Sequence, residues 1–210
     1  MLQIKNLKTH YFTSSGIVQA VDGVSINIES NEIIGLVGES GCGKSTIATS
    51  ILRLIRPPGK IIDGDILFNG QNLVELSENS MREIRGHKIA SIFQDPMTYL
   101  NPVFKIKMQI AESIMTHQNI SKKEAENRAI ELLDLLQIGD PEEVANRYPH
   151  QLSGGMLQRA LIAIALSCKP LLLIADEPTT ALDVTVQAQI LEILERLKEE
   201  QDMSILLITH

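Results

Sequence analysis

A nine-residue loop rich in glycine constrains this chain more than any other part of the sequence. Residues 38–46 read Gly-Glu-Ser-Gly-Cys-Gly-Lys-Ser-Thr, which matches the pattern G-x-x-x-x-G-K-[ST]. The apolar run at 33–37 predicts a buried strand before the loop, and residues 44 to about 54 predict a helix after it. This order of strand, loop and helix indicates a backbone that wraps the phosphates of a nucleoside triphosphate.

The residue types of the loop suit that chemistry. Glycines let the backbone approach phosphate oxygens closely, and the following helix presents its positive end to the anion. We expect Lys44 to reach the β- and γ-phosphates and the hydroxyl of Ser45 to ligate Mg²⁺. The thiol of Cys42 is expected to do nothing, because that position of the pattern is variable. The predicted nucleotide-binding residues are Gly38, Glu39, Ser40, Gly41, Cys42, Gly43, Lys44, Ser45 and Thr46.

Short apolar runs alternate with helical patterns over most of the chain. Two of the runs, 171–175 and 205–208, are wholly apolar, which is typical of central parallel strands covered on both faces. Between about 101 and 167 the patterns are instead mostly helical. The sequence therefore predicts an α/β core interrupted by a helical insert. Further strands are predicted at 66–68 and 89–93.

Two carboxylates follow the apolar run at 171–175. Ligands of open α/β sheets sit at the carboxyl ends of the strands. Asp176 is placed to hold Mg²⁺, directly or through water, and Glu177 is the natural group to polarise an attacking water. An acidic turn after a strand is common in itself, and the phosphate loop elsewhere in the chain is what favours the functional interpretation.

Three further features have both a plain and a functional interpretation. Gln94 follows the strand at 89–93, where a glutamine is usually only a polar loop residue. His210 follows the strand at 205–208, and a single histidine is more often structural than catalytic. Ser153 precedes two glycines and a helix that runs to about Ser167. It is either an ordinary helix cap or part of a helix end that holds phosphate.

Composition narrows the choice of partners. The chain has 210 residues, 44% of them hydrophobic and 21% charged, with a formal net charge of -7. The acidic balance and 3% aromatic content argue against nucleic acid as a partner. Cys42 and Cys168 form no disulfide framework, which fits a reducing compartment. No signal peptide is visible, and no apolar run reaches the roughly 20 residues that a membrane span needs.

Taken in chain order, these motifs resemble those of the ATP-binding cassette ATPases. The resemblance implies one nucleotide-binding domain with a phosphate-loop core, a mostly parallel sheet and an N-terminal antiparallel β region. Residues 1–95 and 168–210 would form the α/β catalytic core, and about 96–167 the helical subdomain. The motifs are the phosphate loop, Gln94, Leu152-Ser-Gly-Gly-Met-Leu-Gln-Arg159, Leu173-Ile-Ala-Asp-Glu-Pro178, Ala181-Leu182-Asp183 and His210.

Members of this family work as head-to-tail dimers, either of two copies or of two related cassettes. The resemblance implies that ATP lies between the phosphate loop of one copy and Ser153, Gly154 and Gly155 of the other. These three residues are called the signature below. Asp183 would cross the dimer interface.

The resemblance also gives roles to residues outside the loop. Gln94 would sense the γ-phosphate and Mg²⁺, as a third metal-linked residue beside Ser45 and Asp176, and link them to the membrane partner. His210 would contact the γ-phosphate and help to position the water. Tyr11 is the best-placed residue to stack on adenine, with Phe12 as second choice.

A narrower resemblance joins the chain to the oligopeptide, dipeptide and nickel importer subfamily. It rests on residues 93–102, 148–152 and 175–184. It implies an ATPase that works on the cytoplasmic face of the membrane under two permease subunits, while an extracytoplasmic binding protein selects the solute. Di- or oligopeptides are the expected solutes, and nickel or another solute is the alternative.

Two other functions are compatible with parts of the sequence. One is a nucleotide-binding module without turnover. The other is a soluble cassette ATPase for translation or DNA repair, but such proteins usually carry paired cassettes or long coiled-coil inserts.

The chain departs from the pattern in two places. Leu157 stands where many relatives carry Arg. The chain also stops at His210, whereas relatives continue with further helices and strands, often with a cysteine-bearing extension for an iron–sulfur cluster. We therefore expect a C-terminal truncation that affects dimer closure and turnover but not the nucleotide loop.

Overall fold

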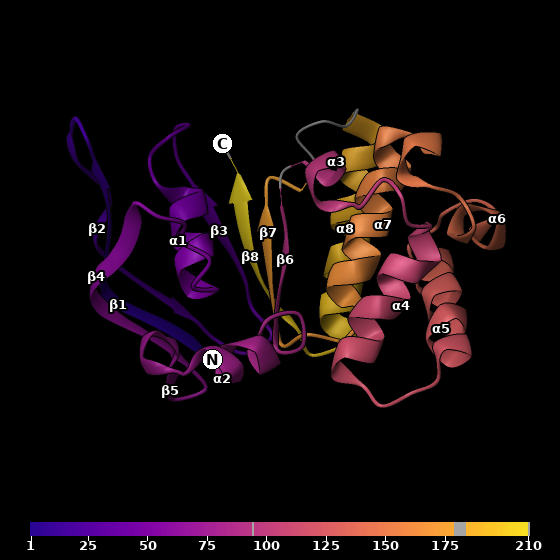
Figure 1. The fold of residues 1–210 in the computed structure, drawn as a ribbon, viewed down its shortest axis with the longest axis horizontal. Coiled ribbons are helices and arrows are strands. Elements are labelled where there is room, and N and C mark those ends of the chain that lie inside the picture. The colour runs from indigo at the N-terminus through magenta and orange to yellow at the C-terminus, as the bar shows by residue number, and fades with distance from the viewer. Residues whose placement is uncertain (94, 179–183, 210) are drawn as a thin grey trace.

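The strands of this protein form two separate sheets (Figure 1). The structure, a computed structural model, describes residues 1–93, 95–178 and 184–209. The first sheet is antiparallel, with the strand order β2-β1-β4-β5, as the family resemblance implied for the N-terminal region. Its strands are β1 (Leu2–Thr13), β2 (Gly16–Ile28), β4 (Gly59–Phe68) and β5 (Gln71–Asn72).

The second sheet is parallel and has the order β3-β8-β7-β6. The order places two central strands, β8 and β7, next to each other although α8 separates them along the chain. The predicted parallel sheet is therefore confirmed, with strand ends within a residue or two of the predicted ones. The strands are β3 (Ile33–Val37), β6 (Ile89–Ile92), β7 (Leu172–Asp176) and β8 (Ser204–Thr209).

The strand predicted at 33–37 is present, but the prediction that it is buried is wrong. Ile33 and Val37 are 44% and 66% exposed, whereas Ile34 and Leu36 pack against the hydrophobic core. The exposure of these two side chains follows from the position of β3 in the sheet. Among the described residues β3 pairs only with β8, at the edge of the sheet, so only one of its faces is covered.

Helices fill the space on both sides of the parallel sheet (Figure 1). Helix α1 lies between the two sheets, where a hydrogen bond of 2.9 Å joins the buried hydroxyls of Thr9 in β1 and Ser50 in α1. The predicted helix from 44 to 54 ends at Ile51, because Arg53 adopts a left-handed backbone conformation with φ of 51°. Helix α2 and the turn η1 precede β6. Their bounds are α1 (Lys44–Ile51), α2 (Glu78–Ile84) and η1 (Leu73–Glu75).

The other face of the sheet carries the predicted helical insert. Helices α3 to α7 all fall between β6 and β7, and α8 packs with them in one hydrophobic cluster. None of the helices in the described part of the chain has the length and apolarity needed to cross a membrane. The elements are α3 (Pro96–Tyr99), α4 (Ile106–His117), α5 (Lys122–Leu135), α6 (Pro141–Ala145), η2 (Pro149–Gln151), α7 (Gly154–Leu166) and α8 (Val184–Glu200).

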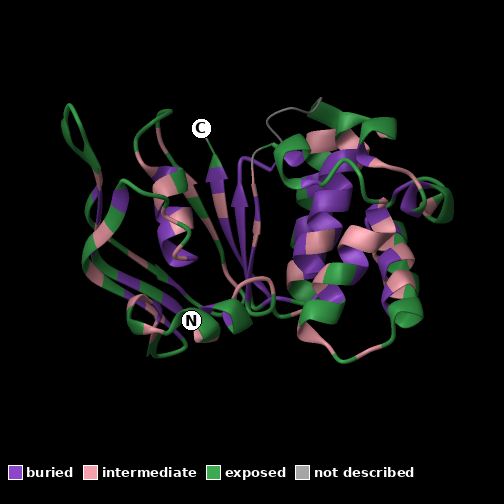
Figure 2. Cartoon of the chain, viewed as in Figure 1, coloured by how far each residue is buried: buried purple, intermediate pink, exposed green. Residues whose placement is uncertain are grey.

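Strand β7 separates two hydrophobic cores. Leu172 and Ile174 belong to the core that includes α1 and the first sheet, whereas Leu173 and Ala175 belong to the core of the helical region. All five residues of the strand are buried (Figure 2). Because successive side chains of a strand point to opposite faces, the two cores together fix the position of its last residue, Asp176.

Candidate nucleotide-binding site

The phosphate loop connects β3 to α1, as the sequence predicted. Gly41 and Gly43 have φ of 81° and 99°, in the region that disfavours residues with a side chain. A Cβ atom on Gly43 would lie 2.1 Å from the carbonyl oxygen of Ala20, so only glycine fits there. Ala20 belongs to β2, which means that the first sheet presses directly on the loop.

The side chain of Lys44 lies folded over the loop. Its Nζ donates hydrogen bonds to the carbonyl oxygens of Gly38 (2.6 Å) and Glu39 (2.8 Å), and the residue is buried. The ammonium group is thereby held within the curve of the backbone. A phosphate that enters the loop would exchange these neutral acceptors for charged ones, which bind an ammonium group more strongly.

A cavity of ≈220 Å³ opens beside the loop, and Glu177 lines it. Glu177 is mostly buried, has φ of 49°, and donates its backbone N–H to the carbonyl oxygen of Ile208 (3.0 Å). The structure thus brings the carboxylate at the end of β7 to the loop, as predicted. The other lining residues are Ala20, Ser40, Gly41, Gly43, Lys44, Ser45 and Thr46.

A second cavity, of ≈290 Å³, contains Asp176. Ser45 lines both cavities, so its hydroxyl is common to the surroundings of Asp176 and of Glu177. A hydroxyl and a carboxylate are oxygen ligands of the kind that Mg²⁺ takes from proteins. The residues present therefore fit a magnesium ion between Ser45 and Asp176. The cavity is also lined by Thr49, Phe93, Asp95, Thr98 and Tyr99.

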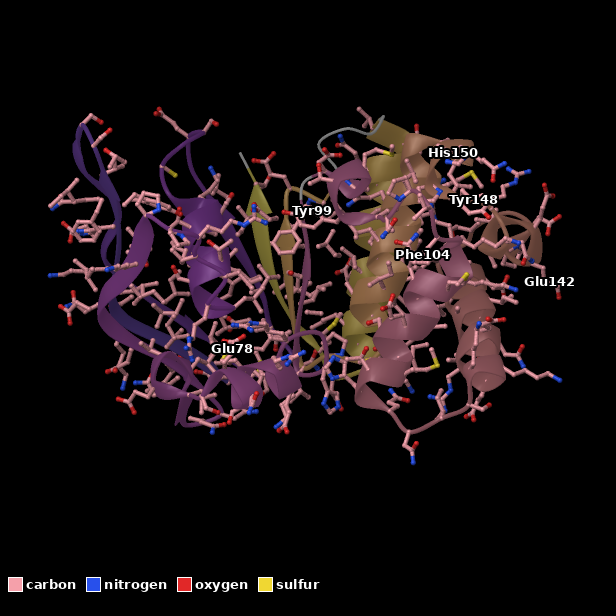
Figure 3. All side chains as sticks on the ribbon, in the orientation of Figure 1. Glu78, Tyr99, Phe104, Glu142, Tyr148 and His150 are labelled. Atoms are coloured by element: carbon pink, nitrogen blue, oxygen red, sulfur yellow. The ribbon has the colours of Figure 1, made fainter. Side chains whose placement is uncertain are left out.

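The walls of this second cavity include residues that the sequence did not single out. The Thr98 hydroxyl (2.7 Å) and the Met97 N–H (3.0 Å) donate hydrogen bonds to the Asp95 carboxylate, and these bonds lower its pKa. The rings of Phe93 and Tyr99 stack with centroids 4.4 Å apart (Tyr99 is labelled in Figure 3). Such contacts depend on the short helix α3, whose four residues give no periodic signal. Gln94, which these residues flank, lies outside the described part of the structure.

The signature lies at the N-terminus of α7. The Ser153 hydroxyl accepts a hydrogen bond from the Met156 N–H (3.4 Å), so Ser153 caps the helix, while its contact with phosphate stays a prediction. A Cβ atom on Gly155 would touch Val186 of α8 at 3.4 Å. Ser153 and Gly154 are exposed, and none of the three signature residues lines either cavity at the phosphate loop. Within one chain, loop and signature therefore do not form one site.

The remaining predicted site residues do not line the cavity at the loop or lie outside the described residues. The ring of Tyr11 is half-buried against Gly59, where a Cβ atom would be 2.6 Å from its Cε1 atom. Phe12 is exposed. Among the described residues, neither ring lines the cavity at the phosphate loop, so the adenine contact stays a prediction. Asp183 and His210 lie outside the described residues.

A glycine loop between a parallel strand and a helix, with carboxylates from a second parallel strand beside it, defines a phosphate-loop nucleotide-binding protein. A family model described as ABC transporter matches residues 21–180. The chain belongs to this ABC transporter family, as its motifs predicted.

The matches to known relatives cover the whole of this chain. It is 52% identical to the probable peptide ABC transporter ATP-binding protein y4tR of Sinorhizobium fredii, and it covers 63% of that protein. It is 51% identical to the oligopeptide transport ATP-binding protein OppD of Bacillus subtilis and covers 59% of it. The chain thus spans about three fifths of the length of these relatives.

A solved structure gives the same fold. The cassette MJ0796, in a dimeric post-hydrolysis state bound to ADP and Pi, matches with a TM-score of 0.90 and 31% sequence identity. The match covers 100% of this chain and 88% of that one.

Proposed function

We propose that this chain is the ATP-binding and ATP-hydrolysing part of an ABC importer for di- or oligopeptides. The observation that carries the proposal is the position of Glu177, which lines the same cavity as the phosphate loop. A triphosphate in the loop would put its terminal phosphate beside this carboxylate. The names of the two relatives, both ATP-binding proteins of peptide transport, support peptides over nickel as the solute.

Each residue of the half-site has one task in this proposal. Lys44 and the amides of the loop bind the β- and γ-phosphates and stabilise the charge that develops during transfer. Ser45 and Asp176 hold the magnesium ion, which supplies further neutralisation of phosphate charge. Glu177, which lines the cavity at the loop, orients the attacking water. Gln94 and His210 complete the set, as the family resemblance implies.

A second copy of the chain, or a related cassette, completes the site. Ser153 and Gly154 are exposed, and the signature does not line the cavity at the loop, so it is available to a nucleotide bound elsewhere. Ser153, Gly154 and Gly155 begin α7, and the N-terminus of a helix attracts anions. The dimeric state of the cassette MJ0796 supports a dimer here as well. As the family resemblance implies, Asp183 would cross the interface of that dimer.

The membrane partners are two permease subunits that the chain meets at the cytoplasmic face of the membrane. Four apolar side chains in and after α3 are exposed, up to 70% for Val103. Exposed apolar surface of this kind marks an interaction site. Helix α3 begins two residues after Gln94 in the sequence, so a partner docked there would contact the segment that follows the residue proposed to sense the γ-phosphate. The four residues are Met97, Tyr99, Val103 and Phe104 (Tyr99 and Phe104 are labelled in Figure 3).

The test is the substitution Glu177→Gln in the purified protein with its permease partners. It keeps the shape of the side chain but removes the carboxylate that accepts a proton from water. ATP binding should persist, while phosphate release falls by at least about a hundredfold, in line with the usual size of general-base contributions. Glu199→Gln, at an exposed position of α8, is the control. Turnover at the wild-type rate in the Glu177→Gln protein would contradict the role of Glu177.

A further inference from the structure

A cavity unrelated to the phosphate loop lies at the base of the helical region. We call it the basal cavity. Its volume is ≈510 Å³, within the range of about 300–1,000 Å³ that is usual for small-molecule sites. One wall is a face of α5. Other lining residues stand at the C-terminal ends of three further helices: Gln118 after α4, Ser167 after α7 and Gln201 after α8.

The wall of the basal cavity is partly apolar. Leu132 and Leu135 of α5 are only half-buried, although both pack against the core of the helical region. Leu166, at the end of α7, also lines the cavity and is fully buried. The two half-buried leucines thus offer apolar surface that a ligand side chain would remove from water.

The rim carries charges of both signs. Glu131 of α5 and Lys169 after α7 line the cavity and are exposed. Neither of them forms an ion pair within 4.0 Å in the part of the chain that the structure describes. Arg128 adds a second positive group, already engaged with the Oε1 atom of Gln118 (2.6 Å) and with Glu124. The rim therefore suits a ligand with one negative and one positive end.

The residues at the helix ends indicate how such a ligand is oriented in the basal cavity. The Oε1 atom of Gln201 is buried and accepts no hydrogen bond from the described residues. A buried acceptor without a donor is costly, so rotation of this side chain toward a donor group of a ligand in the cavity would be favoured. The C-terminal ends of three helices add partial negative charge around the cavity. Both features favour an ammonium group near Gln201.

We propose that the basal cavity binds a free amino acid or a short peptide with an apolar side chain. The ammonium group lies toward Gln201 and Glu131, the carboxylate toward Lys169, and the side chain against Leu132 and Leu135. The cavity thereby recognises the same class of molecule that the importer is proposed to deliver.

Helix α7 connects this cavity to the nucleotide. It ends with Leu166 in the cavity wall and begins at Gly154 in the signature, 13 residues or about 20 Å away. A ligand that shifts the C-terminal end of a rigid helix also shifts its N-terminal end. Solute accumulated inside the cell would thus change how well the signature meets ATP on a second copy. This regulatory step rests on the proposed function, whereas binding to the cavity does not.

Calorimetric titration of the purified protein tests the binding step. The probes are the dipeptide Ala-Leu, free L-leucine and N-acetyl-L-leucine amide, which lacks both charges. We expect saturable binding of at least one zwitterion and binding at least tenfold weaker for the uncharged probe. The ratio of the two zwitterion affinities tells whether the ligand is a peptide or an amino acid. The absence of saturation with both zwitterions, or equal binding of the uncharged probe, would overturn the proposal.

Variants tie the binding to this cavity. Glu131→Gln and Lys169→Met should each weaken the better zwitterion at least tenfold, and Glu142→Gln, at an exposed site of α6, should not (Glu142 is labelled in Figure 3). Unchanged affinity in both cavity variants would also overturn the proposal. Binding of a fluorescent ATP analogue, measured in parallel, should be the same in all variants. If the wild-type protein failed to bind that analogue, the proposed function would be wrong. The titration would still test whether the basal cavity binds the zwitterions.

Discussion

Single residues of the phosphate loop are held by backbone contacts rather than by side-chain packing. Gly43 lies under the carbonyl oxygen of Ala20, whereas Gly41, two residues before it, has open space where a Cβ atom would be. Both have positive φ. The pair therefore separates the cost of backbone strain from the cost of a steric clash within one loop.

We predict that Gly43→Ala is much more damaging than Gly41→Ala. The second change adds only the left-handed strain of about 1–2 kcal/mol. The first adds the same strain and a Cβ atom 2.1 Å from an oxygen, which forces β2 away from the loop. Chemical denaturation measures the loss of unfolding free energy, and titration of an ATP analogue measures the loss of binding. Equal losses in the two variants would contradict the contact with Ala20.

Lys44 gives a prediction about binding rather than folding. Lys44→Met removes the ammonium group that is held inside the loop but keeps the length of the side chain. Charge-assisted hydrogen bonds contribute about 1.5–3 kcal/mol each, so affinity for an ATP analogue should fall at least about tenfold. Equilibrium titration measures the change. Lys5→Met, at an exposed position of β1, should bind as the wild type does.

The sequence predicted where the loop, Asp176 and Glu177 lie better than it predicted their neighbours. Asp176, Glu177 and the loop were found because each follows an apolar strand, and carboxyl ends of parallel strands meet at one edge of a sheet. Ala20 was not found, because its contact with Gly43 depends on how two sheets pack. No pattern along the chain records such a contact.

At the scale of the elements, one buried arginine joins three helices of the helical region. Arg159 of α7 donates hydrogen bonds to the carbonyl oxygen of Leu136 after α5 and to the Oε1 atom of Gln189 in α8 (2.8 Å). It is mostly buried, and this burial lowers the pKa of its guanidinium group. The helices therefore depend on a polar contact within an otherwise apolar core.

Replacing this arginine should destabilise the protein. Arg159→Ala leaves the buried carbonyl of Leu136 without its donor, whereas the exposed amide of Gln189 can bond to water instead, and the unfolding free energy should fall by about 1–3 kcal/mol. Urea denaturation measures the change. The control is Arg147→Ala, which removes an arginine that pairs at the surface with Glu143, four residues before it. This change should cost less than about 1 kcal/mol. A smaller loss for Arg159 than for Arg147 would contradict this interpretation.

A pair of histidines predicts a dependence of stability on pH. His117 at the end of α4 stacks on His87 before β6, with ring centroids 5.5 Å apart. Burial, and then the neighbouring His87, lower the pKa of His117. Since the unfolded chain takes up its proton at a higher pH, this histidine costs stability as the pH falls below about 6.5.

The substitution His117→Gln tests this sign. Between about pH 7.5 and about pH 5, the wild type should lose more unfolding free energy than the variant, because only the wild type has the depressed histidine to protonate. Thermal or urea denaturation at both pH values measures the difference. An equal or larger loss in the variant would show that His117 is not responsible.

The burial of a strand was predicted correctly where an apolar strand lies between two hydrophobic cores. Strands β7 and β8 are apolar and lie between two cores, as expected. Strand β3 is just as apolar but lies at an edge, and apolar composition alone does not distinguish these positions. Helix α3 was not predicted, because four residues are too few for a helical period to be visible.

At the scale of the whole molecule, the main feature is the distance between loop and signature in one chain. The two lie on different elements, α1 and α7, on opposite sides of the parallel sheet (Figure 1). If two copies share their sites, then a defect in the loop and a defect in the signature are complementary.

Mixing two defective proteins should therefore restore one site. Lys44→Met has a defective loop, and Ser153→Glu places negative charge where the γ-phosphate would meet the signature. Both would carry Glu177→Gln to slow turnover. ATP-dependent association, measured by light scattering, should be weak for each protein alone and should increase when they are mixed. Wild-type association of the Ser153→Glu protein alone would contradict a shared site.

Strand β7 has a further consequence, for the cooperativity of unfolding. Its side chains alternate between two cores, so neither core can open without exposing one face of this strand. The amide hydrogens of Leu173 and Ile174 should then exchange with solvent only when the entire molecule unfolds. The carboxylate of Asp176, which we propose as a magnesium ligand, is attached to the end of this strand, in the part of the fold that we expect to fluctuate least.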